Sequence, residues 1–282
     1  MTESPDPRPR PEANSQSRSG GGSVSAERVT TPVGDSSIVT LVDGLGPAIV
    51  VLPSYGRDGG LDYDDFAVRA AEQGWRVLRP QPRGVLGSVG PMEGVTFRDL
   101  ADDVAGVIGA LADGPTVLVG HAFGNLLSRM VTTEHPDLIR AVAIVASQSR
   151  EVPERIAQAP FIVGDPTRPT TERLAVLQEA FFAPGHDARV WLDGWYPQTL
   201  AMQRAAVEGV PLKQYWRCGS VPLLEVIPDH DAFKPKKYWG EMRADFGDRV
   251  STAVVAGAGH ALFPEQPEAA AEAVLSWARN FR

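Results

Sequence analysis

Apolar runs of strand length recur along this chain and limit its fold more than any other feature. The first covers residues 48–52 and ends at Pro53, and similar runs cover 116–119 and 141–145. Strand patterns return at 223–227 and 250–255. A continuous apolar run is typical of a strand in a parallel sheet, because helices cover both faces of such a sheet.

Helical patterns separate these runs, which favours an α/β fold. We expect helices near 63–73, 96–111, 123–134 and 267–278, a strand at 76–78, and a first hairpin formed by 29–33 and 38–42. Thr96 with Asp99 three residues later has the spacing of a capping box. The alternation predicts a mostly parallel central sheet flanked by helices.

Two segments depart from this alternation. Residues 149–217 lack strong strand runs but have helical spacing and large aromatic residues, so we expect a helical cap inserted after the sixth strand. The sheet domain then consists of 28–148 and 218–282. Residues 1–27 are rich in Pro, Ser and Gly with few apolar side chains, which predicts a disordered tail.

Composition excludes several classes of function. The formal net charge of −8 argues against nucleic acid as a partner. Cys218 is the only cysteine, so no internal disulfide can form, and a reducing compartment fits best. We find neither a signal-peptide pattern nor an apolar run of membrane-spanning length, and we therefore expect a cytoplasmic protein without a membrane partner.

Residues Gly120-His121-Ala122-Phe123-Gly124 follow a predicted strand and open a predicted helix. This segment resembles the nucleophile elbow G-x-S-x-G of α/β-hydrolases, with alanine where that family has the nucleophilic serine. The turn is strained, and side chains at the two glycine positions would collide with the neighbouring strand and helix. The elbow is thus retained while its hydroxyl is absent.

Further segments resemble the family's motifs in the family's order. Leu52-Pro53-Ser54-Tyr55-Gly56 stands where the family has His-Gly after its third strand, and 83–88 resembles the loop after the fourth strand. The resemblance implies an oxyanion hole from the backbone N–H groups of Tyr55 and Phe123.

The acid and the histidine of the family also have counterparts. Residues 228–235 resemble the turn that carries the acid, which selects Asp231, with Asp229 as the alternative. Ala256-Gly257-Ala258-Gly259-His260 follows the last strand, like the loop of the catalytic histidine. The resemblance implies a capped, esterase-like α/β-hydrolase fold over residues 28–282 and a His260–Asp231 dyad.

A plainer interpretation stands beside each of these residues. His260 can be a core or surface histidine, and the carboxylate of Asp231 can belong to a solvated turn. His121 is expected to pack beneath the elbow, Ser54 to make hydrogen bonds in a turn, and Cys218 to have no chemical role. Trp191, Trp195 and Tyr196 fit the core of the cap as well as the lining of a substrate pocket.

Ala122 leaves three interpretations open: an esterase-like hydrolase inactivated by Ser→Ala, a natural enzyme using a His-Asp dyad, or a ligand-binding pseudoenzyme. The chain begins with Met1 and has no tag, which favours a natural alanine. The dyad interpretation is a hydrolase by family, with lyase, cyclase or cofactor-free oxygenase chemistry as further reaction types. We expect a small, largely apolar substrate and neither metal nor cofactor; a homodimer stays open.

Overall fold

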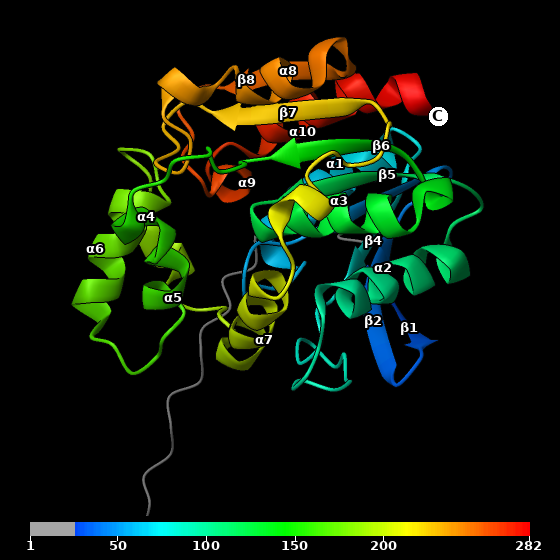
Figure 1. Cartoon of the computed structure of the whole chain (residues 1–282), viewed down its shortest axis with the longest axis horizontal. Coiled ribbons are helices and arrows are strands. Elements are labelled where there is room, and N and C mark those ends of the chain that lie inside the picture. Colours follow the sequence, from blue (N-terminus) through cyan, green and yellow to red (C-terminus); the bar gives the residue numbers. More distant parts are fainter. Residues whose placement is uncertain (1–25) are drawn as a thin grey trace, which may run out of the picture.

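In the computed structural model, which describes residues 26–282, eight strands form one sheet in the order β1-β2-β4-β3-β5-β6-β7-β8 (Figure 1). The pairs β1–β2 and β2–β4 are antiparallel, and the other neighbours are parallel. The strands are β1 (Glu27–Val33), β2 (Ser36–Asp43), β3 (Ala48–Leu52), β4 (Arg76–Pro80), β5 (Thr116–His121), β6 (Ile139–Val145), β7 (Leu223–Pro228) and β8 (Val250–Val255).

Helices cover both faces of the sheet, as the apolar runs predict. One face packs on α2 (Phe97–Leu111), α3 (Phe123–Glu134) and α8 (Glu241–Phe246), and the other on α1 (Asp64–Glu72) and α10 (Pro267–Ala278). Alternate residues of β3 contribute to the two layers, Val50 to the first and Val51 to the second. The structure therefore confirms the predicted α/β architecture.

The segment between β6 and β7 contains four helices: α4 (Glu154–Ala157), α5 (Ala159–Val163), α6 (Thr170–Ala180) and α7 (Pro197–Glu208). The first three lie together beyond the carboxyl ends of the parallel strands (Figure 1) and share a separate apolar cluster. Helix α7 differs, because its Met202 and Ala206 belong to the apolar cluster of α2 and α3. The segment expected to be one cap thus packs in two parts.

Most predicted elements are present, and the differences are local. Helices α3 and α10 have the expected bounds, and Thr96 and Asp99 form the predicted capping box on α2. The sequence analysis missed α8, which has only six residues between Gly240 and Gly247. The tail predicted for 1–27 lies outside the described residues except for its last two, and Glu27 is not tail but the first residue of β1, opposite Val42.

Candidate active site

Ala122 lies at the apex of a sharp turn between β5 and α3. Its backbone has φ 51° and ψ −111°, a region that residues other than glycine rarely occupy. A Cβ on Gly120 would lie 2.3 Å from the carbonyl oxygen of Gly124, and a Cβ on Gly124 would lie 2.1 Å from that of Leu52. Both glycines are therefore needed for the close approach of strand and helix, as the motif predicts.

His260 and Asp231 are brought together from two loops that follow neighbouring strands. Asp231 follows β7 and His260 follows β8, and the imidazole Nδ1 lies 3.1 Å from each carboxylate oxygen of Asp231. Both residues are 4% exposed. Since a carboxylate only accepts, Nδ1 is the protonated nitrogen of the neutral ring, and Nε2 is left as a base. The ring of Phe233 lies 4.1 Å from the imidazole, centroid to centroid.

Asp229, the alternative acid, contacts the histidine loop instead of the imidazole. Its carboxylate accepts a hydrogen bond from the backbone N–H of Gly257 at 2.8 Å. The side chain of Asp229 is partly exposed, whereas that of Asp231 is fully buried. The geometry therefore favours Asp231 as the partner of His260 and gives Asp229 a contact that holds the loop.

His121 lies beneath the elbow in a buried hydrogen-bond chain. Its Nε2 lies 2.8 Å from the carbonyl oxygen of His260, so Nε2–H must donate there, and Nδ1 then accepts from the hydroxyl of Tyr63 at 2.8 Å. The backbone N–H of Ser54 donates to the same hydroxyl at 3.3 Å. Burial, together with repulsion from His260, lowers the pKa of His121 to about 3. His121 is thus a neutral link between three loops.

Glu265 is a site residue that the sequence analysis missed. Its buried carboxyl accepts hydrogen bonds from Gly259 at 2.7 Å and from Ala183 of the insert at 2.6 Å. Burial raises its pKa, and these two bonds oppose the shift. A glutamate five residues after the histidine of a glycine-rich loop is the only sequence signal, and spacing alone does not reveal a partner 82 residues away.

A pocket with about 450 Å³ of empty space opens above Ala122 and His260. Tyr55 and Phe123, whose backbone N–H groups are the predicted oxyanion donors, both line it, and their rings lie 4.5 Å apart. Ser54 lines it as well, and the hydrogen bonds within residues 26–282 leave its hydroxyl unused. The other lining residues are Asn125, Leu126, Ala146, Gln148, Ala157, Pro160 and Phe233.

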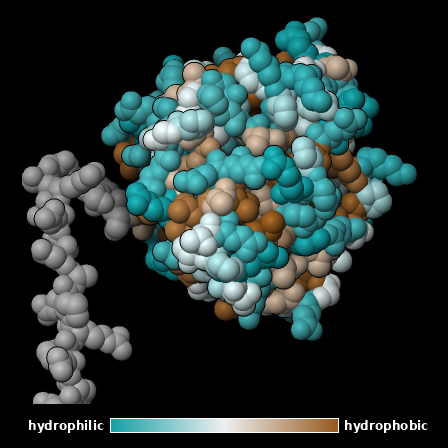
Figure 2. Space-filling view, turned by 90° about the vertical axis from the view of Figure 1, so that its left-hand side faces the viewer, coloured by the Kyte–Doolittle hydropathy of each residue, from teal (hydrophilic) through white to brown (hydrophobic). Residues whose placement is uncertain are grey.

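The insert contributes residues to this pocket that the sequence analysis did not identify. Ala157 of α4 and Pro160 of α5 line the wall, where a small and a cyclic residue gave no pattern to find. Figure 2 shows the face that carries these helices, on which hydrophobic patches lie among hydrophilic side chains.

Trp191, Trp195 and Tyr196 do not line the pocket around His260. Trp191 is fully buried in the cluster of the insert, and the guanidinium of Arg57 lies 4.3 Å from its ring centroid. The indole N–H of Trp195 donates to the carbonyl of Trp191, and the hydroxyl of Tyr196 contacts Asp58 at 3.4 Å. The structure thus gives these aromatics packing partners and does not place them beside the dyad.

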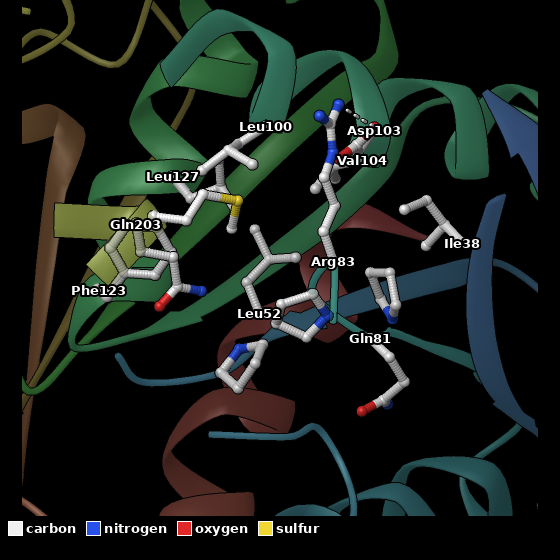
Figure 3. A pocket seen from close by; sticks show the side chains of 14 residues that line it. Ile38, Leu52, Gln81, Arg83, Leu100, Asp103, Val104, Phe123, Leu127 and Gln203 are labelled. Atoms are coloured by element: carbon white, nitrogen blue, oxygen red, sulfur yellow. Dashed lines mark hydrogen bonds and ion pairs between the residues drawn. The ribbon is translucent and has the colours of Figure 1, made fainter. Parts of the chain in front are cut away.

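Phe123 also lines a separate pocket (Figure 3), which has about 450 Å³ of empty space as well. Leu52, Leu100, Leu127 and Met202 give it apolar walls. At one end, Arg83 forms two hydrogen bonds with Asp103 of α2, at 2.6 and 3.0 Å.

Neither of these pockets offers an evident metal site. Among residues 26–282, no group of three or more His, Cys, Asp or Glu side chains is arranged to hold a metal ion. In the same part of the chain, we find no helix with the length and apolar character needed to span a membrane.

Known proteins resemble this chain in sequence. The 2-(acetamidomethylene)succinate hydrolase of Mesorhizobium japonicum is 42% identical over 102 residues, which is 36% of this chain and 36% of that enzyme, so the match spans about a third of that relative. A pyrethroid hydrolase of Sphingobium wenxiniae is 25% identical over 236 residues, covering 78% of this chain and 83% of the enzyme.

Solved structures resemble it in fold. The crystal structure of E-2-(acetamidomethylene)succinate hydrolase has a TM-score of 0.75 at 19% identity and covers 90% of this chain and 99% of its own. An esterase from Thermogutta terrifontis has a TM-score of 0.74 at 19% identity, with 91% and 99% covered. The sequence model described as the alpha/beta hydrolase family matches residues 40–273, and with the sheet and elbow above it shows that this chain belongs to the alpha/beta hydrolase family.

Proposed function

We propose that this protein is an enzyme of the α/β-hydrolase fold that works without a serine nucleophile. His260, oriented by Asp231, performs acid–base chemistry on a small, largely apolar substrate. The observation that carries the proposal is the contact of Nδ1 with both oxygens of Asp231, 3.1 Å each, in a pocket that also contains Ala122. This contact leaves Nε2 free to take a proton.

Ala122 suits such a base because a methyl group cannot attack a carbonyl. Its small size leaves room for a water molecule or a substrate atom beside the imidazole. Asp231 keeps the neutral ring in one tautomer and stabilises it once it is charged. The amides of Tyr55 and Phe123 are the donors that would stabilise negative charge developing on a substrate oxygen.

Hydrolysis is the reaction type we favour within this proposal. In that reaction Nε2 takes a proton from a water molecule, whose oxygen attacks the substrate carbonyl, and the protonated imidazole then donates to the leaving group. The names of the relatives, a succinate-derivative hydrolase and a pyrethroid hydrolase, support hydrolysis. Lyase, cyclase and cofactor-free oxygenase reactions would use the same base.

We also propose that residues 149–217 act as the cap of this site. Ala157 and Pro160 line the pocket, and Glu265 ties the insert at Ala183 to the loop of His260. A cap held in this way separates the pocket from bulk solvent and selects substrates by shape.

The experiment compares variants on substrates found by screening uncharged esters and amides. His260→Ala should lower kcat by about 10²–10⁴-fold, the usual contribution of a positioned acid–base group. Asp231→Asn should cost somewhat less. His135→Ala is the matched control, because this partly exposed histidine follows α3 and contacts Asp102, and it should keep full activity. Full turnover by His260→Ala on any substrate found refutes the dyad mechanism.

Ala122→Ser separates the remaining interpretations. An inactivated serine hydrolase regains esterase activity in this variant by several orders of magnitude. A dyad enzyme changes little, because its base already acts without the hydroxyl. A binding protein retains its ligand in both forms and turns over none of the screened compounds.

A further inference from the structure

The pocket above Ala122 adjoins another pocket. A neighbouring pocket with about 790 Å³ of empty space has three lining residues in common with it: Asn125 and Leu126 of α3, and Gln148 of the loop after β6. The pocket that His260 lines is called the inner chamber below. The neighbouring pocket, with about 790 Å³ of empty space, is called the outer chamber. Shared walls at three positions make the two chambers adjoining parts of one cleft.

The outer chamber is lined on its far side by the segment between α7 and β7. Leu212 and Trp216 come from this segment, and Leu126 faces them from α3. Two serines also line the chamber, but their hydroxyls are already engaged: Ser149 donates to the carbonyls of Glu151 and Phe233, and Ser147 to the carboxyl of Glu225. The amides of Asn125 and Gln148 line the chamber too, but most of the wall surface is apolar.

Trp216 is held rigidly as one wall of the outer chamber. The guanidinium of Arg129 lies 4.1 Å from its ring centroid, and the indole N–H donates to Asp245 at 3.0 Å. Arg129 is itself fully buried and donates to the carbonyl oxygen of Trp216 and to the sulfur of Met242. A flat aromatic surface fixed on its edge and on one face presents a preformed contact area for an apolar group.

The two charged residues that line the outer chamber, Arg150 and Lys213, are both exposed. Arg150 is exposed and forms an ion pair with Asp245, so its charge is already compensated. Lys213 is exposed as well, so its ammonium is solvated. The chamber therefore favours an uncharged apolar group.

We infer that the substrate is elongated, with its reacting carbonyl in the inner chamber and an uncharged alkyl or aryl arm in the outer chamber. The arm passes between Leu126 and Gln148 and lies against Trp216 and Leu212. This inference rests on the proposed function only for the position of the reacting group. The binding of the arm follows from the apolar walls and does not require turnover.

Binding of uncharged probes tests the inference without any catalytic step. We would titrate the full chain by calorimetry with 4-nitrophenyl ketones that carry an acetyl, butanoyl or hexanoyl group, because a ketone has no bond that the proposed hydrolysis could break. Each methylene placed in an apolar chamber tightens binding by about threefold to fourfold, so the hexanoyl probe should bind roughly 100-fold more tightly than the acetyl probe. Equal affinities across the series overturn the inference.

Two variants locate the arm. Leu126→Trp should block the passage and remove most of the gain in affinity of the hexanoyl probe over the acetyl probe. Leu212→Asp, at a half-exposed position that tolerates a polar residue, should reduce the same gain without affecting folding. The control is Leu45→Asp, since Leu45 is 82% exposed and precedes β3, whereas residues 147–150 of the chamber follow β6 at the other end of these parallel strands. An unchanged chain-length dependence in both chamber variants refutes the inference.

The two proposals fail in different measurements. If His260→Ala keeps full turnover while the probes show the chain-length dependence, the dyad mechanism is wrong and the outer chamber stands. If His260→Ala loses turnover while the affinities are equal, the mechanism stands and the arm does not occupy the outer chamber.

Discussion

A buried ion pair beneath the acid turn offers the sharpest test of how the site is held. The ammonium of Lys234 lies 2.7 Å from a carboxylate oxygen of Glu225, and the two side chains are 2% and 0% exposed. Lys234 lies three residues after Asp231, and its backbone N–H donates to the Asp231 carbonyl at 3.1 Å. The second carboxylate oxygen of Glu225 is buried without a hydrogen-bond partner in residues 26–282.

We predict that Lys234→Met lowers the free energy of unfolding by about 3–5 kcal/mol, because it leaves a carboxylate buried without its counter-ion. For a chain of this size the melting temperature should fall by roughly 10 °C. The double variant Glu225→Met/Lys234→Met should recover most of the loss, since it buries no charge. Urea unfolding of the wild type, both single variants and the double variant measures the coupling.

The pH dependence of Lys234→Met follows from the direction of the Glu225 pKa. Burial already raises this pKa, and Lys234 opposes the shift. Without Lys234 the folded-state pKa rises further above the unfolded value, so the variant loses stability as pH increases through that range and regains it at low pH. Its deficit should be larger at pH 8 than at pH 5.

The control is an exposed ion pair on α7. Glu208→Gln removes the partner of Arg204, whose side chain is 41% exposed, and should change stability by less than about 0.5 kcal/mol. A Lys234→Met protein within 1 kcal/mol of wild type at pH 8 would refute the reasoning. So would a double variant whose loss equals the sum of the single losses.

Other predictions concern the elbow and the loops around it. Gly124→Ala should prevent folding or cost several kcal/mol, because its Cβ meets the Leu52 carbonyl, whereas Gly109→Ala in α2, with open space around it, should stabilise by about 0.5–1 kcal/mol in urea unfolding. His121→Asn should lessen the loss of stability in acid. Because the pKa of His121 is lowered to about 3 in the folded state, only the unfolded state binds this proton between pH 6.5 and 5, and the free energy of unfolding of the wild type should fall by about 2 kcal/mol over that range. Glu265→Gln should keep melting within a few degrees but reduce protection of the Gly259 amide in hydrogen exchange, and unchanged protection would contradict its role in holding that loop.

The fold was largely predictable because its signals are local. Helix α3 begins directly after Ala122 of the elbow, and α10 begins at Pro267, a residue typical of a first helical turn. The capping box of Thr96 and Asp99 marks the start of α2. The glycine contacts of the elbow follow from the motif alone. The short α8 lacks a comparable signal, since two glycines border it and one turn and a half buries only Met242.

The site was predictable where its residues follow strands, and less so where it depends on packing. Asp231 and His260 follow adjacent parallel strands, so their meeting follows from the topology. The choice between Asp231 and Asp229 depends on the path of one turn, which spacing does not define. Trp191 shows the same limit, because aromatic character predicts burial but does not specify which cavity it adjoins.

In the elbow, the residues that the fold requires are different from the residue at the nucleophile position. Gly120 and Gly124 carry the close contacts of strand and helix, and the turn keeps its positive φ with a plain alanine at its apex. A φ of 51° excludes β-branched residues at position 122 but admits other small side chains. A longer side chain at position 122, such as serine or cysteine, would therefore extend into the pocket that His260 also lines and would leave the surrounding scaffold unchanged.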